Sequence, residues 1–216
     1  MNYEGIEITK IAHDCFKVKK GIVIYIDPFQ LSDNEEKADI ILITHEHFDH
    51  CSIADIKKII KDSTKLVAIN ECLSKLNQFE NNNLKIVKPG SKLAINDIGI
   101  EAVPAYNIDK FRSPNITFHP KEDGHVGYIL TINGKRIYHT GDSDVIPEMK
   151  EIKNIGIMLV PVSGTYVMTW KEAANAVRII KPKIAIPMHY STVVGSEKDA
   201  EKFKQEASEI TKVEIL

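Results

Sequence analysis

One short stretch constrains this chain more than any other. The run Thr44-His45-Glu46-His47-Phe48-Asp49-His50 places three histidines and an aspartate within six residues. It follows the apolar run 39–43, which is typical of a buried strand. Just downstream, Ser52 and Asp55 have the spacing of a capping box ahead of an apolar helical stripe. The polar cluster is therefore predicted to lie in a short loop between a strand and a helix.

This context favours a metal site over a solvated loop that happens to be rich in histidine. Residues two apart in an extended chain point the same way, so His45 and His47 can direct their imidazoles at one point. Asp49 and His50 follow one turn later and can serve a neighbouring point. Imidazole and carboxylate together suit zinc, manganese or iron, and a rigid support is what such a site requires.

The pattern H-x-H-x-D-H after an apolar strand resembles the metallo-β-lactamase superfamily. Within it, the chain is most similar to the branch of the ascorbate-phosphate lactonase-like and N-acyl-phosphatidylethanolamine phospholipase D-like hydrolases. The resemblance implies an α/β fold, a four-layer αββα sandwich, and one metallo-hydrolase domain over residues 1–216. It covers essentially the whole chain, because further segments match in order at 11–16, 26–28, 138–142 and 186–190.

The resemblance also implies a ligand set for two metals. His45 and His47 would bind one ion, Asp49, His50 and His189 the other, and the carboxylate of Asp142 would bridge them. Taken without the resemblance, Asp142 is an ordinary turn aspartate and His189 a core or surface histidine.

The third ligand of the first metal departs from the family pattern. Relatives carry a histidine where Asn107 stands, and an amide is a poor zinc ligand beside imidazole. The segment 106–124 is predicted to be an irregular active-site loop, and its His119 is predicted to complete the site. The alternatives are His125, and a solvated His119 that leaves this metal site weak or empty.

Several other residues have two interpretations each. Asp27 ends a strand as a turn residue or orients a metal-bound histidine. His13 is a structural residue with a satisfied hydrogen bond or supports a metal ligand, and His139 is a core residue or supports a metal ligand. Tyr190 either donates a hydrogen bond to a developing oxyanion, as a catalytic residue beside Asp49, or packs at a strand end. Residues 163–166 are expected to line the pocket.

The rest of the chain reads as two similar halves, each running from short strands into alternating strands and helices. Asn133-Gly134 predicts a hairpin turn, and Thr169 with Glu172 and Ser196 with Asp199 repeat the capping spacing. The Asn-rich run 78–83 is predicted to be a loop. Helices with one apolar stripe must cover the faces of sheets, which suits the sandwich.

Composition limits the classes of partner. A net charge of -2 gives no electrostatic footprint for nucleic acid, and no apolar run approaches membrane-spanning length. The start lacks a signal-peptide pattern, and three scattered cysteines favour a reducing compartment, so cytoplasm is the expected location. The expected partner is a small-molecule substrate, and a homo-oligomer is compatible with the sequence.

These observations predict a metal-dependent hydrolase holding one or two Zn²⁺ ions, with Mn²⁺ or Fe²⁺ as alternatives. The resemblance implies a lactone, ester, amide or phosphodiester substrate. Metal-bound hydroxide would attack it, and Asp49 would hold this nucleophile and move its proton. The alternatives are a nuclease of the same superfamily, a di-iron oxidoreductase, and a non-catalytic metal-binding protein. The Asn107 departure keeps the last of these open.

Overall fold

The chain forms two compact units. The computed structural model describes residues 1–79 and 83–216, and it groups Met1–Lys88 with Leu216 as unit 1 and Pro89–Ile215 as unit 2. The sequence also predicts two halves, but it places the start of the second half at Val126, whereas unit 2 begins at Pro89 and so includes the strands over 92–104. That both belong to one domain stays a prediction. Residues 80–82 of the predicted 78–83 loop lie outside the described residues.

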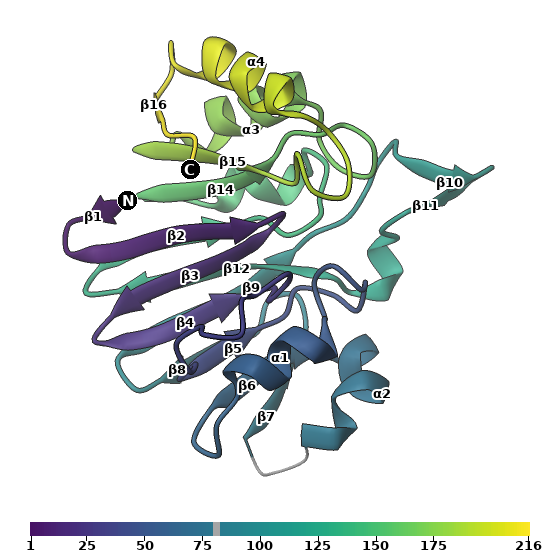
Figure 1. The fold of residues 1–216 in the computed structure, drawn as a ribbon. Coiled ribbons are helices and arrows are strands. Elements are labelled where there is room, and N and C mark those ends of the chain that lie inside the picture. Colours follow the sequence, from purple (N-terminus) through teal and green to yellow (C-terminus); the bar gives the residue numbers. More distant parts are fainter. Residues whose placement is uncertain (80–82) are drawn as a thin grey trace. The chain divides into compact units, whose positions relative to one another are not determined.

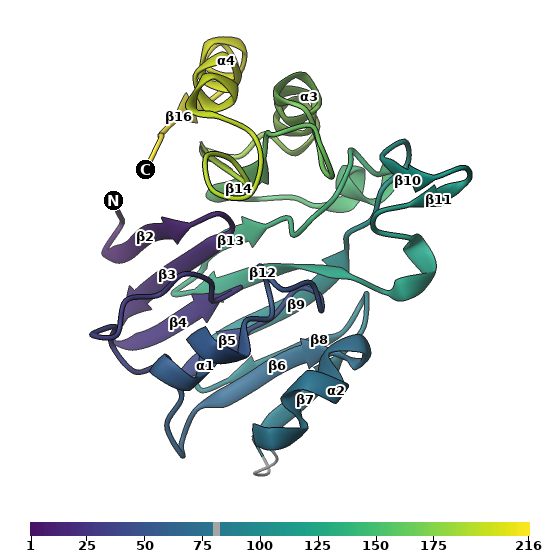
Figure 2. The ribbon, with the colours of Figure 1, turned by 45° about the vertical axis from the view of Figure 1, so that its right-hand side comes forward.

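Unit 1 is built on a mixed sheet whose spatial order equals its sequence order, β1-β2-β3-β4-β5-β6-β7. The pairs from β1 to β4 are antiparallel and the pairs from β4 to β7 are parallel. Helices α1 and α2 follow β5 and β6 and lie on one face of this sheet (Figure 1; Figure 2). The bounds are β1 (Asn2–Tyr3), β2 (Ile6–Ala12), β3 (Cys15–Lys20), β4 (Ile22–Ile26), β5 (Ile40–Leu42), α1 (Ile53–Ile59), β6 (Lys65–Ile69), α2 (Leu73–Leu76) and β7 (Leu84–Val87), with short 3₁₀ turns at Asn70–Cys72 and Asn77–Phe79.

Unit 2 has a second mixed sheet, in the order β16-β15-β14-β13-β12-β9-β8. Strands β13 to β16 are parallel, whereas β8, β9, β12 and β13 pair antiparallel. Asn133 and Gly134 join β12 to β13 with φ values of +48° and +74°, the left-handed pair that a type I′ turn requires. The bounds are β8 (Lys92–Ile95), β9 (Ile98–Pro104), β12 (Val126–Ile132), β13 (Lys135–His139), β14 (Ile157–Pro161), β15 (Ile184–Met188) and β16 (Lys212–Val213), with 3₁₀ turns at Lys121–Asp123 and Pro147–Glu151.

The segment 106–124, predicted to be irregular, is partly ordered as a small hairpin. Strands β10 (Phe111–Ser113) and β11 (Ile116–Thr117) pair antiparallel. Below them the backbone N–H of Phe118 donates to the carbonyl of Lys110 at 3.0 Å, and that of Asn107 to the carbonyl of His119 at 2.8 Å. The predicted irregularity was wrong at the centre of this segment, because these bonds continue the hairpin down to a closed base at Asn107 and His119. The active-site role of the segment stays a prediction.

Helices α3 (Trp170–Ile180) and α4 (Glu197–Ala207) lie side by side in unit 2 (Figure 1; Figure 2). Both begin with the reciprocal capping box that the sequence predicts, at Thr169 and at Ser196. Their apolar stripes, which include Val177 and Phe203, belong to one buried cluster with β13 and β14. In the described residues, no helix is long and apolar enough to span a membrane.

Candidate metal centre

In each unit, polar residues follow the carboxyl ends of neighbouring parallel strands. In unit 1 these strands are β4 and β5, which are followed by Asp27 and by the segment 44–50. In unit 2 they are β13, β14 and β15, which are followed by Asp142, Ser163 and His189. Parallel strands end at the same edge of a sheet, so side chains from separate segments gather there, as they do at ligand sites of open α/β sheets.

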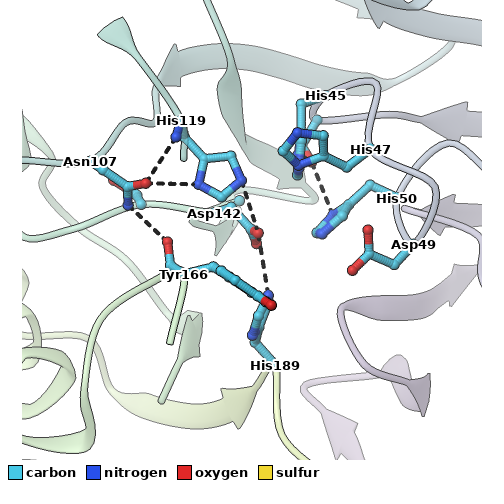
Figure 3. Close-up of polar contacts among 12 residues, drawn as sticks. His45, His47, Asp49, His50, Asn107, His119, Asp142, Tyr166 and His189 are labelled. Carbon is cyan, nitrogen blue, oxygen red and sulfur yellow. Dashed lines mark hydrogen bonds and ion pairs between the residues drawn. The ribbon is translucent and has the colours of Figure 1, made fainter. Parts of the chain in front are cut away.

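We call His45, His47, Asp49 and His50 the N-terminal ligand set. His45 Nε2 and His47 Nδ1 lie 3.0 Å apart, so the two imidazoles predicted to share a metal do converge (Figure 3). His45 and His50 are fully buried, Asp49 is nearly so, and His47 is partly exposed. The set therefore combines a rigid, buried base with one edge that solvent reaches.

Asp27 orients two of these histidines. Its Oδ1 accepts the backbone N–H of Thr44 at 2.8 Å, and its Oδ2 lies 2.7 Å from Thr44 Oγ1 and 2.8 Å from His50 Nδ1. A carboxylate only accepts hydrogen bonds, so the Thr44 hydroxyl donates its proton to Asp27. Towards His45 Nδ1, 3.0 Å away, the same hydroxyl can then only accept. His45 and His50 must then carry their protons on Nδ1, which leaves each Nε2 as the nitrogen for a metal.

His13 and Asp14 lie in the turn between β2 and β3 and face the same set. His13 Nε2 is 3.3 Å from Asp49 Oδ2, and Asp14 Oδ2 is 3.8 Å from His50 Nε2. His13 is thus placed to orient the carboxylate of Asp49, in line with one of its two predicted roles. Asp14 was not singled out from the sequence, although it stands in the segment 11–16 that carries part of the resemblance.

We call His119, Asp142 and His189 the C-terminal ligand set. Asp142 Oδ2 lies 3.4 Å from His119 Nε2 and 3.3 Å from His189 Nε2, so one carboxylate oxygen stands between two imidazoles from distant segments (Figure 3). All three side chains are almost completely buried. Gly141 permits this arrangement, because its φ is +63° and an added Cβ would lie 2.6 Å from the carbonyl oxygen of Val126.

Two further residues hold the histidines of this set. Ser163 Oγ is 2.9 Å from His189 Nδ1. Asn107 Oδ1 is 3.0 Å from His119 Nδ1 (Figure 3). In both rings the Nδ1 atom is engaged and the Nε2 atom faces Asp142. The sequence placed Ser163 only in a pocket-lining run, since a lone serine carries no spacing signal.

The remaining predicted residues lie farther from this chemistry. His139 accepts the backbone N–H of Gly141 on Nδ1 at 3.2 Å, so it supports the turn that carries Asp142. His125 packs its ring edge-on to His119, with centroids 5.6 Å apart. Tyr190 belongs to the buried apolar cluster of unit 2, where burial and the charge of Glu197 raise its pKa to about 12. Its catalytic role stays a prediction.

Three site residues have a strained backbone, although other residues of the chain also have a positive φ. His13, Asp27 and His189 have φ values of +49°, +48° and +59°, a left-handed conformation that side chains other than glycine adopt rarely. Such residues persist only where the surrounding structure fixes them, and they are frequent at functional sites. Here the hydrogen bonds of Asp27 and His189 supply that fixation.

The donor separations in unit 2 fit a transition metal, and in unit 1 two imidazoles converge somewhat more closely. Two ligand atoms bound to one tetrahedral zinc at about 2.0–2.2 Å stand roughly 3.3–3.5 Å from each other. The observed separations are 3.0 Å for His45 and His47, 3.4 Å for His119 and Asp142, and 3.3 Å for His189 and Asp142. In unit 2 both imidazoles have their second nitrogen engaged and lie beside a carboxylate, which is the chemistry that such an ion selects.

Residues 7–189 match the family model of the β-lactamase superfamily domain. The chain belongs to the metallo-β-lactamase superfamily. It is 31% identical over 218 residues to a UPF0173 metal-dependent hydrolase of Archaeoglobus fulgidus, covering 93% of this chain and 90% of that protein. A UPF0173 metal-dependent hydrolase of Methanopyrus kandleri is 32% identical over 225 residues, covering 95% and 93%.

Solved structures agree with this membership. A Parabacteroides distasonis protein, provisionally described as a metal-dependent hydrolase, superposes with a TM-score of 0.83 at 36% identity, over 97% of this chain and 92% of its own. A metallo hydrolase of Ignicoccus hospitalis gives a TM-score of 0.78 at 25% identity, over 98% and 94%. The predicted fold class is confirmed, and this member of the superfamily is classed with the metal-dependent hydrolases. The finer lactonase-like and phospholipase-like branch stays a prediction.

Proposed function

We propose that this metallo-β-lactamase superfamily member binds two transition-metal ions, preferably zinc, through the N-terminal and C-terminal ligand sets together. It would use them to hydrolyse a small-molecule lactone, ester, amide or phosphodiester. His45, His47 and His119 would serve one ion, and Asp49, His50 and His189 the other, with Asp142 shared. The proposal extends the family assignment to a metal, a stoichiometry and a reaction.

The position of Asp142 supports this proposal most directly. Its Oδ2 contacts His119 and His189, the two histidines proposed to serve different ions, at nearly equal distances of 3.4 and 3.3 Å. A carboxylate shared between two metal ions needs one imidazole on each side of it. An ordinary turn aspartate would turn towards backbone N–H groups or solvent instead.

When bound, such ions lower the pKa of a water molecule and polarise the oxygen of the scissile group. The chain's own residues supply the rest. Asp49, held by His13 at 3.3 Å, would orient the attacking water and accept its proton. Thr44, Ser163 and Asn107 would keep the ligand imidazoles in place, so that little rearrangement accompanies the reaction.

A small organic substrate suits the surroundings of His189 better than a polymer does. The Tyr166 ring lies edge-on to His189 with centroids 6.5 Å apart, and Phe118 packs against Tyr166 at 4.7 Å. These aromatic faces offer contact to an apolar acyl or aryl group. A net charge of -2 argues against the nuclease alternative. We retain the cytoplasm as the proposed location, since Cys15, Cys51 and Cys72 are all free and buried.

Metal content is the first test. Protein purified without chelator should hold up to two zinc ions per chain by elemental analysis, and a His45→Ala/His189→Ala double variant should hold far less, because each substitution removes one nitrogen ligand. A Lys57→Ala/Asn175→Ala variant, altered at two exposed helix positions, is the matched control. Wild-type protein with no more metal than the double variant would remove the basis of the proposal.

Turnover is the second test, and it separates an enzyme from a non-catalytic metal-binding protein. Bis-p-nitrophenyl phosphate, a γ-thiolactone and an aryl ester should be hydrolysed slowly, with loss of activity in chelator and recovery on adding Zn²⁺ or Mn²⁺. Metal binding without turnover of any of the three probes would favour the non-catalytic alternative.

A further inference from the structure

We propose that Asn107 is a positioning residue that fixes the tautomer of His119, and that it is not itself a metal ligand. Asn107 would hold the proton of His119 on Nδ1 and so present Nε2 to the metal. The presentation of Nε2 to a metal rests on the proposed function, whereas the tautomer of His119 is a property of the metal-free chain. It assigns a role to the residue that departs from the family pattern.

The orientation of the Asn107 side-chain amide follows from two backbone partners. Its Oδ1 accepts the backbone N–H of His119 at 2.9 Å, and its Nδ2 donates to the backbone carbonyl of Tyr166 at 2.9 Å. A backbone N–H can only donate and a carbonyl can only accept, so rotating the amide by 180° would break both bonds. A weaker contact from Nδ2 to Asp144 Oδ1, at 3.4 Å, has the same sense.

This fixed oxygen then determines where the imidazole proton lies. The same Oδ1 is 3.0 Å from His119 Nδ1, and an amide oxygen can only accept. His119 Nδ1 must therefore carry a proton. In the neutral ring Nε2 is then the bare nitrogen, and it is this atom that faces Asp142 Oδ2 at 3.4 Å. Two electron-pair donors directed at each other are stabilised by a cation that both can bind.

Asp142 makes the role of Asn107 necessary. Without an acceptor at Nδ1, the neutral ring of His119 would gain most by placing its proton on Nε2 and donating it to the nearby carboxylate. That single hydrogen bond would occupy both ligand atoms at once. Asn107 opposes it with an oxygen buried beside Nδ1, since Asn107 is 5% exposed and His119 is 1% exposed.

The geometry also argues against Asn107 as the missing ligand. Its Oδ1, the atom that a metal would bind, already accepts two N–H groups, and its Nδ2 is directed to Tyr166 and Asp144. Coordination by Asn107 would cost these buried bonds for a weak amide ligand. His119 offers an imidazole at the same base of the hairpin, and this imidazole would be the third nitrogen ligand of the first metal beside His45 and His47.

Nitrogen NMR of histidine-labelled, metal-free protein tests the tautomer directly. At alkaline pH, where the ring is neutral, His119 should show a protonated Nδ1 and a bare Nε2 in wild type. The His119→Gln variant assigns the signal. Asn107→Ala should shift the population towards the Nε2–H form. Asn107→Asp should retain the wild-type tautomer, because it keeps the acceptor oxygen while losing the two donated bonds.

Metal competition against a chromophoric chelator gives a second readout. Asn107→Ala should lower the affinity for one of the two ions by about 10–100-fold and leave the affinity for the other unchanged, as expected for a residue that orients a ligand. Stoichiometry should still reach two at saturating Zn²⁺, whereas His119→Ala should drop it towards one. Asn107→Asp should restore most of the affinity even if its melting temperature falls, and Asn175→Ala, at an exposed position of α3, should match wild type.

These readouts separate failure of this inference from failure of the proposed function. An Nε2–H tautomer in wild type would overturn the inference, and this holds even if Asn107→Ala does not fold. An Asn107→Ala protein with an unchanged tautomer and unchanged zinc affinity would also overturn it. A wild type that binds no metal but shows the Nδ1–H tautomer would instead refute the proposed function and leave the role of Asn107 on the imidazole standing.

Discussion

Replacing Asp27 by asparagine should damage metal binding more than replacing it by alanine. In Asp27→Asn the backbone N–H of Thr44 holds the amide oxygen where Oδ1 now lies, 2.8 Å away. The amide NH₂ then takes the place of Oδ2 and faces Thr44 Oγ1 and His50 Nδ1. His50 must accept on Nδ1, and the Thr44 hydroxyl, now an acceptor from the amide, turns its own proton towards His45 Nδ1.

Both imidazoles would therefore carry their proton on Nε2, the nitrogen that a metal needs. To bind an ion, each ring must move its proton back to Nδ1, where it then faces another donor. Each such buried, unsatisfied group costs about 1–3 kcal/mol of binding free energy. Two rings give about 2–6 kcal/mol, or roughly 30-fold to 10⁴-fold in affinity. Asp27→Ala only releases the rings, for which about 10–100-fold is the usual loss.

The two variants should have the opposite order in stability. Asp27→Ala leaves the buried Thr44 N–H and His50 Nδ1 without their acceptor, and alanine tolerates a φ of +48° less well than asparagine does. We expect Asp27→Ala to unfold at lower urea concentration while Asp27→Asn binds zinc more weakly. Asp33→Asn, whose side chain is 90% exposed, is the control. Equal or tighter zinc binding by Asp27→Asn than by Asp27→Ala would refute the tautomer reasoning.

Three further predictions follow from single features. Asp142→Ala should abolish turnover of the probes, whereas His139→Ala should reduce it less, because His139 only supports the turn; equal activity of Asp142→Ala and wild type would reject the shared-ligand role. Calorimetry should show one unfolding transition with equal calorimetric and van't Hoff enthalpies if residues 1–216 form one domain, and two resolved transitions would contradict this. The pKa of Tyr190 is raised to about 12 in the folded protein, against about 10 in the unfolded chain. The stability that this shift contributes is complete below a pH of about 10 and should be lost as the pH rises through about 12. Urea titrations between pH 9 and 12 should therefore show wild type losing more stability than Tyr190→Phe.

The features predicted well from the sequence are those with a period or a spacing. The apolar runs, the Asn133-Gly134 turn and the caps at Thr169 and Ser196 all gave elements within a few residues of those observed. The two-residue strands β1 and β16 were missed, because two residues carry no alternation that a pattern can reveal. The hairpin inside the predicted loop 106–124 was missed for a related reason, since its two strands are only three and two residues long.

For the candidate site, the sequence predicts which residue types take part better than it predicts where their side chains point. His45, His47 and His50 follow from one compact motif, but the roles of Thr44 and Ser163 depend on where a hydroxyl points. The pairing of Asn107 with His119, twelve positions apart, depends on the register of a hairpin, which nothing in the sequence specifies. A resemblance could flag Asn107 as a departure, and only the side-chain contacts show what it does.

The closed base of the hairpin has a consequence for how such a protein can diversify. A backbone hydrogen bond joins Asn107 to His119, and several side chains between them face solvent, with Ile108, Phe111 and Ile116 each about half exposed. Changes of length or sequence at the tip, around Pro114 and Asn115, leave the junction as it is. The tip can therefore drift, acquire new recognition or accept a grafted loop while the metal chemistry below is inherited unchanged, which makes specificity and reactivity separately evolvable in this chain.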